Sequence, residues 1–237
     1  MKKIDNIVIV DRFNFDNASD NFDEHVVKSV FSYKKFHEYI INLTKYFIDI
    51  NIKNKILDLG CSTSSLINGI QKEYSNFDID YYGVDISQKM IDFSKNKTKA
   101  NFIKSDIFDY IIKDDNKYNL IISCLTMQFI NLEKRKMIVK EVYKKLENFG
   151  GFILVEKCFE NDSEYSNIFN REYYNFKEKN GFSAKEILEK DKSLVGIMKP
   201  LTIDENIKML NKCGFKTYSI FLKDFNFVGI LCIKKEV

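Results

Sequence analysis

The segment that most constrains the fold is residues 55–62, which read Lys-Ile-Leu-Asp-Leu-Gly-Cys-Ser. Apolar residues surround a carboxylate, and a glycine and small residues follow directly, up to Ser65. An apolar stretch that ends in this way ahead of a helical pattern predicts a strand, a tight turn and a helix. In a doubly wound sheet, such a corner turns backbone N–H groups toward a ligand at the carboxyl end of the strand.

The corner contains one glycine where a dinucleotide fingerprint has three. Gly60 is followed by Ser62 and Ser64, which argues against a pyrophosphate pressed onto the helix. The pattern fits a less anionic nucleoside such as S-adenosylmethionine (SAM), whose charged end is an amino acid. The alternative is that Gly60 only closes a strand in a sheet that binds nothing at this corner. By itself, the corner leaves both interpretations equally open.

Length, charge and cysteine usage narrow the class of protein. The 237 residues suit one large α/β domain, and the net charge is only +3 without a block of like charges, so direct nucleic-acid binding is not expected. The N-terminus does not read as a signal peptide, and no 18-residue apolar run is present, so we expect a cytoplasmic protein that does not span a membrane. The five cysteines show no CxxC spacing, which predicts buried reduced thiols and no metal site.

Apolar segments alternate with helical patterns four to five times along the chain. After the first strand, the expected strands are 80–86, 101–106, 118–124 and 152–158, and a C-terminal hairpin is expected over 216–225 and 227–234. This order predicts a doubly wound, mostly parallel, Rossmann-like α/β sheet of seven strands. By fold analogy, a terminal antiparallel hairpin is typical of class I methyltransferases.

The remaining segments define the domain organisation. Residues 1–21 are expected to form an N-terminal arm, and residues 22–237 a single domain with a helical insertion at about 159–200. The insertion is expected to form a lid, and Ser183 with Glu186 and Thr202 with Glu205 have the spacing of capping boxes. Apolar spacing predicts a helix from Lys34 with an apolar face that reaches Ile50.

Two further helix boundaries follow from the same patterns. Ser62 to Ser64 are expected to cap the crossover helix after the first strand. A stripe of Ile138, Val142, Leu146 and Phe149 predicts a helix that Gly150 stops.

Two acidic residues end neighbouring strands of the predicted sheet. Asp85 ends the second strand, where an acid binds a ribose diol in this fold class. Asp106 ends the third strand, where an acid in SAM-binding sheets reaches the adenine amine while the next residue, Ile107, covers the ring. The alternatives are a helix cap for Asp85 and an ordinary turn aspartate for Asp106. Gly60 together with an acid 25 residues later favours the ligand interpretation.

Several motifs together resemble one known family: Asp58-Leu59-Gly60-Cys61-Ser62, Gly83-Val84-Asp85, Gln128-Phe129, Glu156-Lys157 and Asn180-Gly181. Over about residues 22–235, the chain resembles the carboxy-SAM synthase branch of class I SAM-dependent methyltransferases. The resemblance implies SAM as the cofactor. Its implied contacts, with Asp58 and Cys124 added as candidates, are Tyr33, Asp58, Gly60, Cys61, Ser62, Asp85, Ile86, Asp106, Ile107 and Cys124.

One departure from the family affects the predicted reaction. The family makes carboxy-SAM from SAM and prephenate for tRNA wobble-uridine modification, and an arginine from across a subunit interface binds the added carboxylate. An ungapped match puts Asp191 at that arginine, and an acid there would repel a carboxylate. A one-residue shift would bring Lys190 or Lys192 nearby as a point charge. We therefore favour methyl transfer to a small-molecule acceptor, with carboxy-SAM synthesis as the alternative and a non-catalytic interaction module as a third possibility.

A methyl acceptor that must lose a proton requires a base. The candidate catalytic residues are Glu156 and Tyr33, with His25 and His37 less favoured, because histidines are more often found on helix surfaces. Glu156 has a structural alternative as a partner of Lys157 or of a helix. If the insertion pairs across a two-fold axis, the protein is a homodimer.

Overall fold

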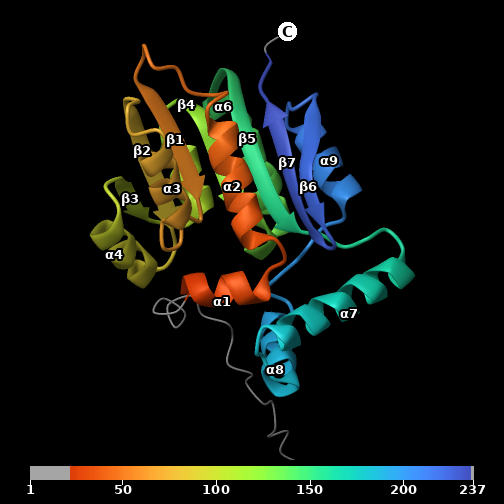
Figure 1. The fold of residues 1–237 in the computed structure, drawn as a ribbon. Helices are drawn as coiled ribbons and strands as arrows, with labels where there is room; N and C mark the ends of the chain where they lie inside the picture. The colour runs from red at the N-terminus through yellow and green to blue at the C-terminus, as the bar shows by residue number, and fades with distance from the viewer. Residues whose placement is uncertain (1–21, 236–237) are drawn as a thin grey trace, which may run out of the picture.

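The computed structural model describes residues 22–235, so the predicted arm at 1–21 lies outside the described residues. Its centre is a seven-stranded sheet with the order β3-β2-β1-β4-β5-β7-β6 (Figure 1). The first five strands pair in parallel, and β7 runs antiparallel to both β5 and β6. The strands are β1 (Asn54–Leu59), β2 (Ile79–Asp85), β3 (Asn101–Lys104), β4 (Tyr118–Cys124), β5 (Leu146–Lys157), β6 (Tyr218–Asp224) and β7 (Phe227–Ile233). The predicted doubly wound sheet and its terminal hairpin are confirmed.

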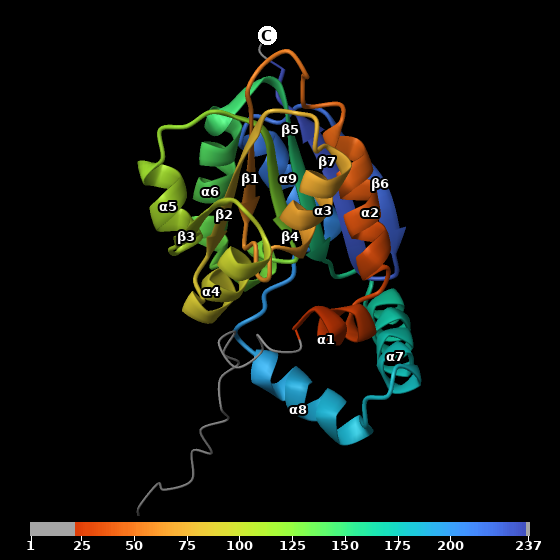
Figure 2. The same cartoon turned by 60° about the vertical axis from the view of Figure 1, so that its left-hand side comes forward.

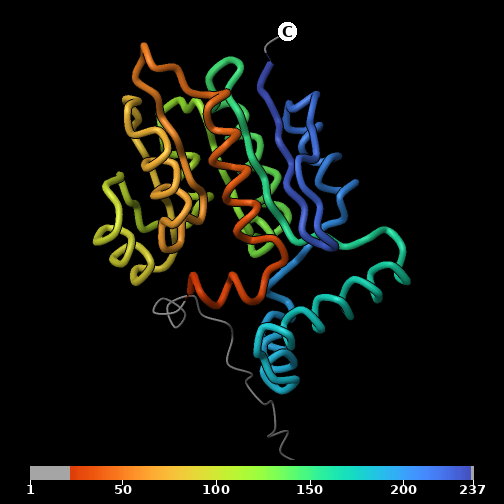
Figure 3. Tube along the Cα trace, viewed as in Figure 1, coloured from red at the N-terminus to blue at the C-terminus, as the bar shows by residue number. Residues whose placement is uncertain are grey.

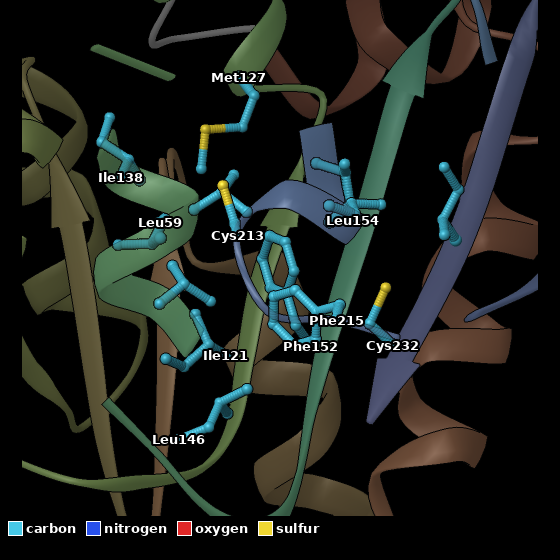
Figure 4. Close-up of a cluster of buried hydrophobic side chains, with 14 of the residues drawn as sticks. Leu59, Ile121, Met127, Ile138, Leu146, Phe152, Leu154, Cys213, Phe215 and Cys232 are labelled. Atoms are coloured by element: carbon cyan, nitrogen blue, oxygen red, sulfur yellow. The ribbon is translucent and has the colours of Figure 1, made fainter. Parts of the chain in front are cut away.

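Helices cover both faces of the sheet, as a doubly wound fold requires. One face carries α2 (Tyr33–Thr44), α3 (Ser65–Glu73) and α4 (Gln88–Lys97), and the other carries α5 (Ile107–Lys113), α6 (Leu132–Lys145) and α9 (Ile203–Lys212). On the side of the sheet that carries α5, α6 and α9, Phe152 of β5 stacks on Phe215, with ring centroids 5.6 Å apart (Figure 4). Because both faces are covered, most of the buried residues in the central strands are apolar.

The predicted end of α6 is wrong by four residues. The helix ends at Lys145, and Leu146 begins β5, where it pairs with Tyr118. Leu146 is fully buried as the pattern required, but Phe149 is 66% exposed and has φ 63°. The apolar spacing of three and four residues continued past the helix because Leu146, a strand residue, is buried as well.

Two other helix boundaries also differ from the prediction. Helix α2 ends at Thr44, whose hydroxyl donates to the Ile40 carbonyl at 2.9 Å, and Ile50 is 60% exposed. Phe47 is buried, although it lies beyond the helix. Ser64 occupies the N-cap position of α3, but its side chain makes no capping hydrogen bond, because its φ of 56° is left-handed rather than extended.

Three helices gather at the carboxyl ends of the parallel strands, and they form the lid. Helix α1 (Phe22–Ser29) precedes the sheet, whereas α7 (Ser163–Lys179) and α8 (Ala184–Leu194) lie within the predicted insertion. Figures 2 and 3 show the three helices below the same end of the sheet. Ser183 with Glu186 and Thr202 with Glu205 form complete capping boxes, as predicted. No helix within residues 22–235 has the length and apolar character needed to cross a membrane.

Candidate active site

A cavity of about 540 Å³ lies between the carboxyl edge of the sheet and the lid helices. Its size is within the usual range for small-molecule sites. All the predicted cofactor contacts line it, namely Tyr33, Asp58, Gly60, Cys61, Ser62, Asp85, Ile86, Asp106, Ile107 and Cys124. The structure therefore brings these residues together around one space, and their role as ligand contacts remains a prediction.

The β1–α3 corner has the geometry that the sequence implies. Gly60 has φ +84°, a conformation that L side chains rarely adopt, and a Cβ atom here would overlap the side chain of Thr126. The backbone N–H of Ser62 donates to Asp85 Oδ2 at 2.9 Å, and Ser87 N–H donates to Oδ1 at 2.9 Å. The corner and the end of β2 are thus joined through one carboxylate, which is held in a fixed orientation at the cavity wall.

Asp58 is the most unusual acid in the cavity. It is 3% exposed, and no described residue forms a hydrogen bond with its carboxylate. Burial, with a smaller contribution from the charge of Asp85, raises the pKa of Asp58 to about 7. A buried carboxylate beside an open space is poorly solvated, and a cationic ligand group would stabilise it.

Asp106 both caps a helix and lines the cavity. Its Oδ1 accepts hydrogen bonds from Phe108 N–H and Asp109 N–H, at 2.7 and 3.4 Å, and so caps α5. The same residue lines the cavity, with the buried Ile107 beside it. Asp106 is therefore a turn aspartate whose cap also fixes it at the position predicted for adenine.

The structure places Glu156 outside the cavity. It is 2% exposed, and it is not among the residues that line the space. Burial raises the pKa of Glu156 to about 8, opposed by the charge of Arg135 and by backbone N–H groups of Thr126, Met127 and Gln128. This placement supports the structural alternative over the role of a base.

Tyr33 lines the cavity, but it is poorly suited to accept a proton. Burial raises the pKa of its phenol well above the usual value, so the group is neutral and can donate a hydrogen bond. Its ring lies 4.3 Å from that of His37, whose pKa burial lowers to about 4. His25 also lines the cavity, and burial followed by the charges of Lys190 and Lys177 lowers its pKa.

Asp23 supports the cavity from outside its lining, and it was not among the predicted site residues. Its carboxylate accepts hydrogen bonds from Thr63 Oγ1, Ser65 Oγ and Lys97 Nζ, at 2.5, 2.8 and 3.0 Å. Burial alone would raise its pKa, but these donors outweigh that effect and lower it. Asp23 thereby fastens α1 to the β1–α3 corner and holds one wall of the cavity in place.

Three lysines gather at the lid end of the cavity, and this gathering was not predicted. Lys157 and Lys190 line the space, and Lys177 lies beside them. The backbone of Lys157 is fixed by Gln128, whose Oε1 accepts from Lys157 N–H at 2.7 Å. The available signal was the position of Lys157 at the carboxyl end of β5. The cavity therefore has carboxylates along the sheet edge and ammonium groups at the lid.

The cysteines add no metal-binding chemistry to the described part of the chain. All five are free, four are buried, and Cys124 is half-buried on the cavity wall. Burial, with smaller contributions from Asp58 and Glu156, raises the pKa of the Cys124 thiol. Within residues 22–235, no group of three or more His, Cys, Asp or Glu side chains could hold a metal ion.

Comparison with known proteins covers nearly the whole chain. Residues 50–212 match a family described as a methyltransferase domain. The carboxy-S-adenosyl-L-methionine synthase of Staphylococcus epidermidis is 35% identical over 94% of this chain and 96% of its own length. The protein of the same name from Nautilia profundicola is 33% identical over 98% and 99%.

Solved structures agree with the fold assignment. A SAM-dependent methyltransferase from Clostridium acetobutylicum has a TM-score of 0.64 at 15% identity, over 94% of this chain and all of that one. A putative methyltransferase from Haloferax volcanii, solved with the activator Trm112, has a TM-score of 0.65 at 14% identity, over 95% and 99%. These similarities confirm the class I methyltransferase fold predicted from the sequence.

Proposed function

Because the chain belongs to the carboxy-SAM synthase family within the SAM-dependent methyltransferases, we propose that it binds SAM in the lid-covered cavity and converts it to carboxy-SAM. The observation that carries the proposal is the polarity of this cavity, which has carboxylates along the sheet edge and lysines at the lid. The ammonium group of SAM suits the carboxylates at the sheet edge, and the carboxylate added in carboxy-SAM suits the lysines at the lid. Identity of 33–35% over almost the full length of relatives with this name supports the same reaction.

The residues of the cavity fit SAM. Asp58 has no hydrogen-bonding partner for its carboxylate among the described residues, and it would receive the ammonium group of the methionine end. Asp85, oriented by the N–H groups of Ser62 and Ser87, would accept the ribose hydroxyls. Asp106 and Ile107 would hold the adenine, and Gly60 allows the ligand to approach the backbone.

The chain contributes mainly orientation and exclusion of water. Bound SAM would supply a sulfonium-activated methyl carbon, which exchanges a proton for a carboxylate group in carboxy-SAM. Alignment of the reacting groups can contribute about 7–11 kcal/mol to lowering a barrier. In this chain, Tyr33 and the lid helices close the cavity over the ligand edge. Prephenate is the proposed carboxylate source, by resemblance to the family. Loss of CO₂ and of its ring hydroxyl would leave phenylpyruvate, and the hydroxide would take up the proton from the methyl carbon to form water.

Methyl transfer to a small-molecule acceptor is the second candidate, and Asp191 is the observation that favours it. This acid stands where an ungapped match to the family places the carboxylate-binding arginine, and it is exposed on α8. A methyltransferase has no need for that arginine. The cavity volume suits a small acceptor beside SAM better than a macromolecular one.

We further propose that the protein is a cytoplasmic homodimer and that residues 22–237 form one domain. The strands run from Asn54 to Ile233, and the segments before and between them pack on the sheet or its lid. Exposed apolar side chains on the predicted insertion support self-association through α7 and α8, namely Tyr165, Ile168, Leu188 and Val195. Light scattering coupled to size exclusion measures the mass directly.

One experiment separates the candidates. The purified protein is incubated with SAM, with and without prephenate, and the masses of the nucleoside products are measured by mass spectrometry. Carboxy-SAM synthesis gives a product heavier than SAM by one CO₂ unit that depends on prephenate. S-adenosylhomocysteine formation with an added acceptor indicates methyl transfer. Absence of SAM binding at high micromolar concentration in equilibrium dialysis would leave only the interaction module.

A further inference from the structure

Three lysines from three separate elements converge at the lid end of the cavity. Lys157 ends β5, Lys177 belongs to α7, and Lys190 belongs to α8. The Nζ atoms of Lys157 and Lys177 lie 4.3 and 4.2 Å from the ring centroid of Tyr173. Lys157, Lys190 and Tyr173 all line the cavity. We call Lys157, Lys177 and Lys190 the lysine cluster.

Burial opposes the positive charge of the lysine cluster. Lys177 is 8% exposed, and burial lowers the pKa of each lysine to about 8, with added repulsion from Lys177 on the other two. Over residues 22–235, no carboxylate lies within 4.0 Å of the ammonium group of Lys157 or Lys177. Tyr173 gives partial compensation through its ring face.

Asp191 is the carboxylate whose charge reaches the cluster. It raises the pKa values of Lys157 and Lys177, opposing the effect of burial. Asp191 is itself exposed at the surface of α8, so its compensation is screened by solvent. The half-buried Lys157 and Lys190 line the cavity in front of the buried Lys177, and the counter-charge of Asp191 is exposed. This arrangement is suited to an anion that enters from the cavity.

We propose that the lysine cluster is a carboxylate-binding subsite built within one chain, and that Asp191 is a resident counter-ion that weakens binding there. This inference rests on the proposed function, since it assigns the opposite end of the same cavity to Asp58 and the ligand ammonium. Hydrogen bonds from ammonium groups to a carboxylate are charge-assisted and strong at a buried site. The bound carboxylate belongs either to carboxy-SAM or to a separate organic acid.

The test measures binding of three probes by calorimetry: SAM, carboxy-SAM and prephenate. The variants are Lys157→Met, Lys177→Met and Lys190→Met, which keep the apolar stem and remove the charge. Lys179→Met and Lys185→Met are the matched controls, because both are exposed on the same two helices. Circular dichroism verifies folding, and Lys157→Arg, which keeps a cation, serves as a further check on the charge.

We expect each cluster variant to bind SAM within about twofold of the wild type and a carboxylate probe about tenfold or more weakly. Weaker binding of carboxy-SAM assigns the carboxylate to the sulfonium ligand, and weaker binding of prephenate assigns it to the separate acid. Asp191→Asn is expected to tighten the same probe severalfold without changing SAM affinity, and Lys157→Arg to retain most of the binding.

Two results would overturn the subsite, and they differ in what they say of the proposed function. If SAM binds normally while every cluster variant holds both carboxylate probes as tightly as the two controls do, the subsite is absent and SAM binding stands. If the wild-type protein does not bind SAM at all, the proposed function and the subsite both fail.

Discussion

Gly60 packs so closely against Thr126 that a single methyl group on Gly60 would occupy the position of the Thr126 side chain. The contact joins the end of β1 to the turn after β4, the two central strands under the cavity. We predict that Gly60→Ala lowers SAM affinity strongly and destabilises the fold by at least about 1–2 kcal/mol, because φ +84° is unfavourable for alanine. Urea unfolding and calorimetry measure the two effects.

The double variant Gly60→Ala/Thr126→Gly separates overlap from backbone strain. It removes the overlapping side chain but leaves the left-handed conformation, so only part of the stability should return. Full recovery would show that the conformation carries no cost. No recovery would show that Thr126 can move aside in the single variant.

Asp58→Asn is predicted to weaken SAM binding by about tenfold or more, because the partner of the ligand ammonium loses its charge. The wild-type affinity should also depend on pH. In the free protein the pKa of Asp58 is about 7, and the ligand prefers the ionised acid, so affinity rises as pH increases through 7 and then levels off. Calorimetry between pH 6 and 8 measures the slope, which Asp58→Asn should reduce. Asp115→Asn, exposed and outside the cavity, is the control.

Glu156→Gln is predicted to retain turnover, because Glu156 lies outside the cavity. A kcat loss above about a hundredfold with unchanged SAM affinity would restore Glu156 as a base, since general-base catalysis contributes effects of that size.

The same variant should change how stability depends on pH. The folded-state pKa of about 8 is above the ordinary value of 4.5, so folding favours the protonated acid. The unfolded chain releases that proton near pH 4.5, and Glu156 therefore reduces stability progressively as pH rises from about 4.5 to 8. Glu156→Gln removes this dependence, so its free energy of unfolding relative to the wild type should increase over that range. Urea titrations at pH 5 and pH 8 provide the comparison, and an identical pH slope in both proteins would contradict the shift.

Asp23→Ala is predicted to release α1 from the β1–α3 corner. The substitution removes the acceptor shared by Thr63, Ser65 and Lys97. Hydrogen exchange should become faster in α1 while the amides of β1 and β4 stay protected, and SAM affinity should fall. Glu24→Ala is the control, because Glu24 is on the same helix and pairs with the exposed Lys28. Equal exchange rates in both variants would show that other contacts hold α1.

The sheet and the cofactor corner could be predicted because their signals are local. An apolar run such as Tyr118 to Cys124 has few alternatives to a buried strand, and the structure gives it the same bounds. Because the carboxyl ends of parallel strands meet at one edge, Asp58, Asp85 and Asp106 could be expected around one space. The resemblance to carboxy-SAM synthases, based on spaced motifs across the chain, is confirmed by full-length relatives.

The orientation of Glu156 could not be predicted from its place near the end of a strand. Successive side chains of a strand point to opposite faces, so Glu156 and Lys157 cannot both face the cavity. The sequence identified the end of β5 but not the pleat, and the structure gives the cavity to Lys157. Lys177 could not be associated with it, because the packing of α7 depends on long-range contacts, and Lys190 was named only through the match to the family. Leu146 and Ile50 were assigned to helices because burial spacing alone does not show where a helix ends.

The walls of the cavity extend along the chain from Phe22 to Phe227. During synthesis on the ribosome, residues such as Asp58 and Asp85 emerge early, but Lys190 and Phe227 emerge more than a hundred residues later. The complete lining of the cavity is consequently available only once β7 has left the exit tunnel. We expect fragments that stop before β7 to retain less SAM through purification than the whole chain does.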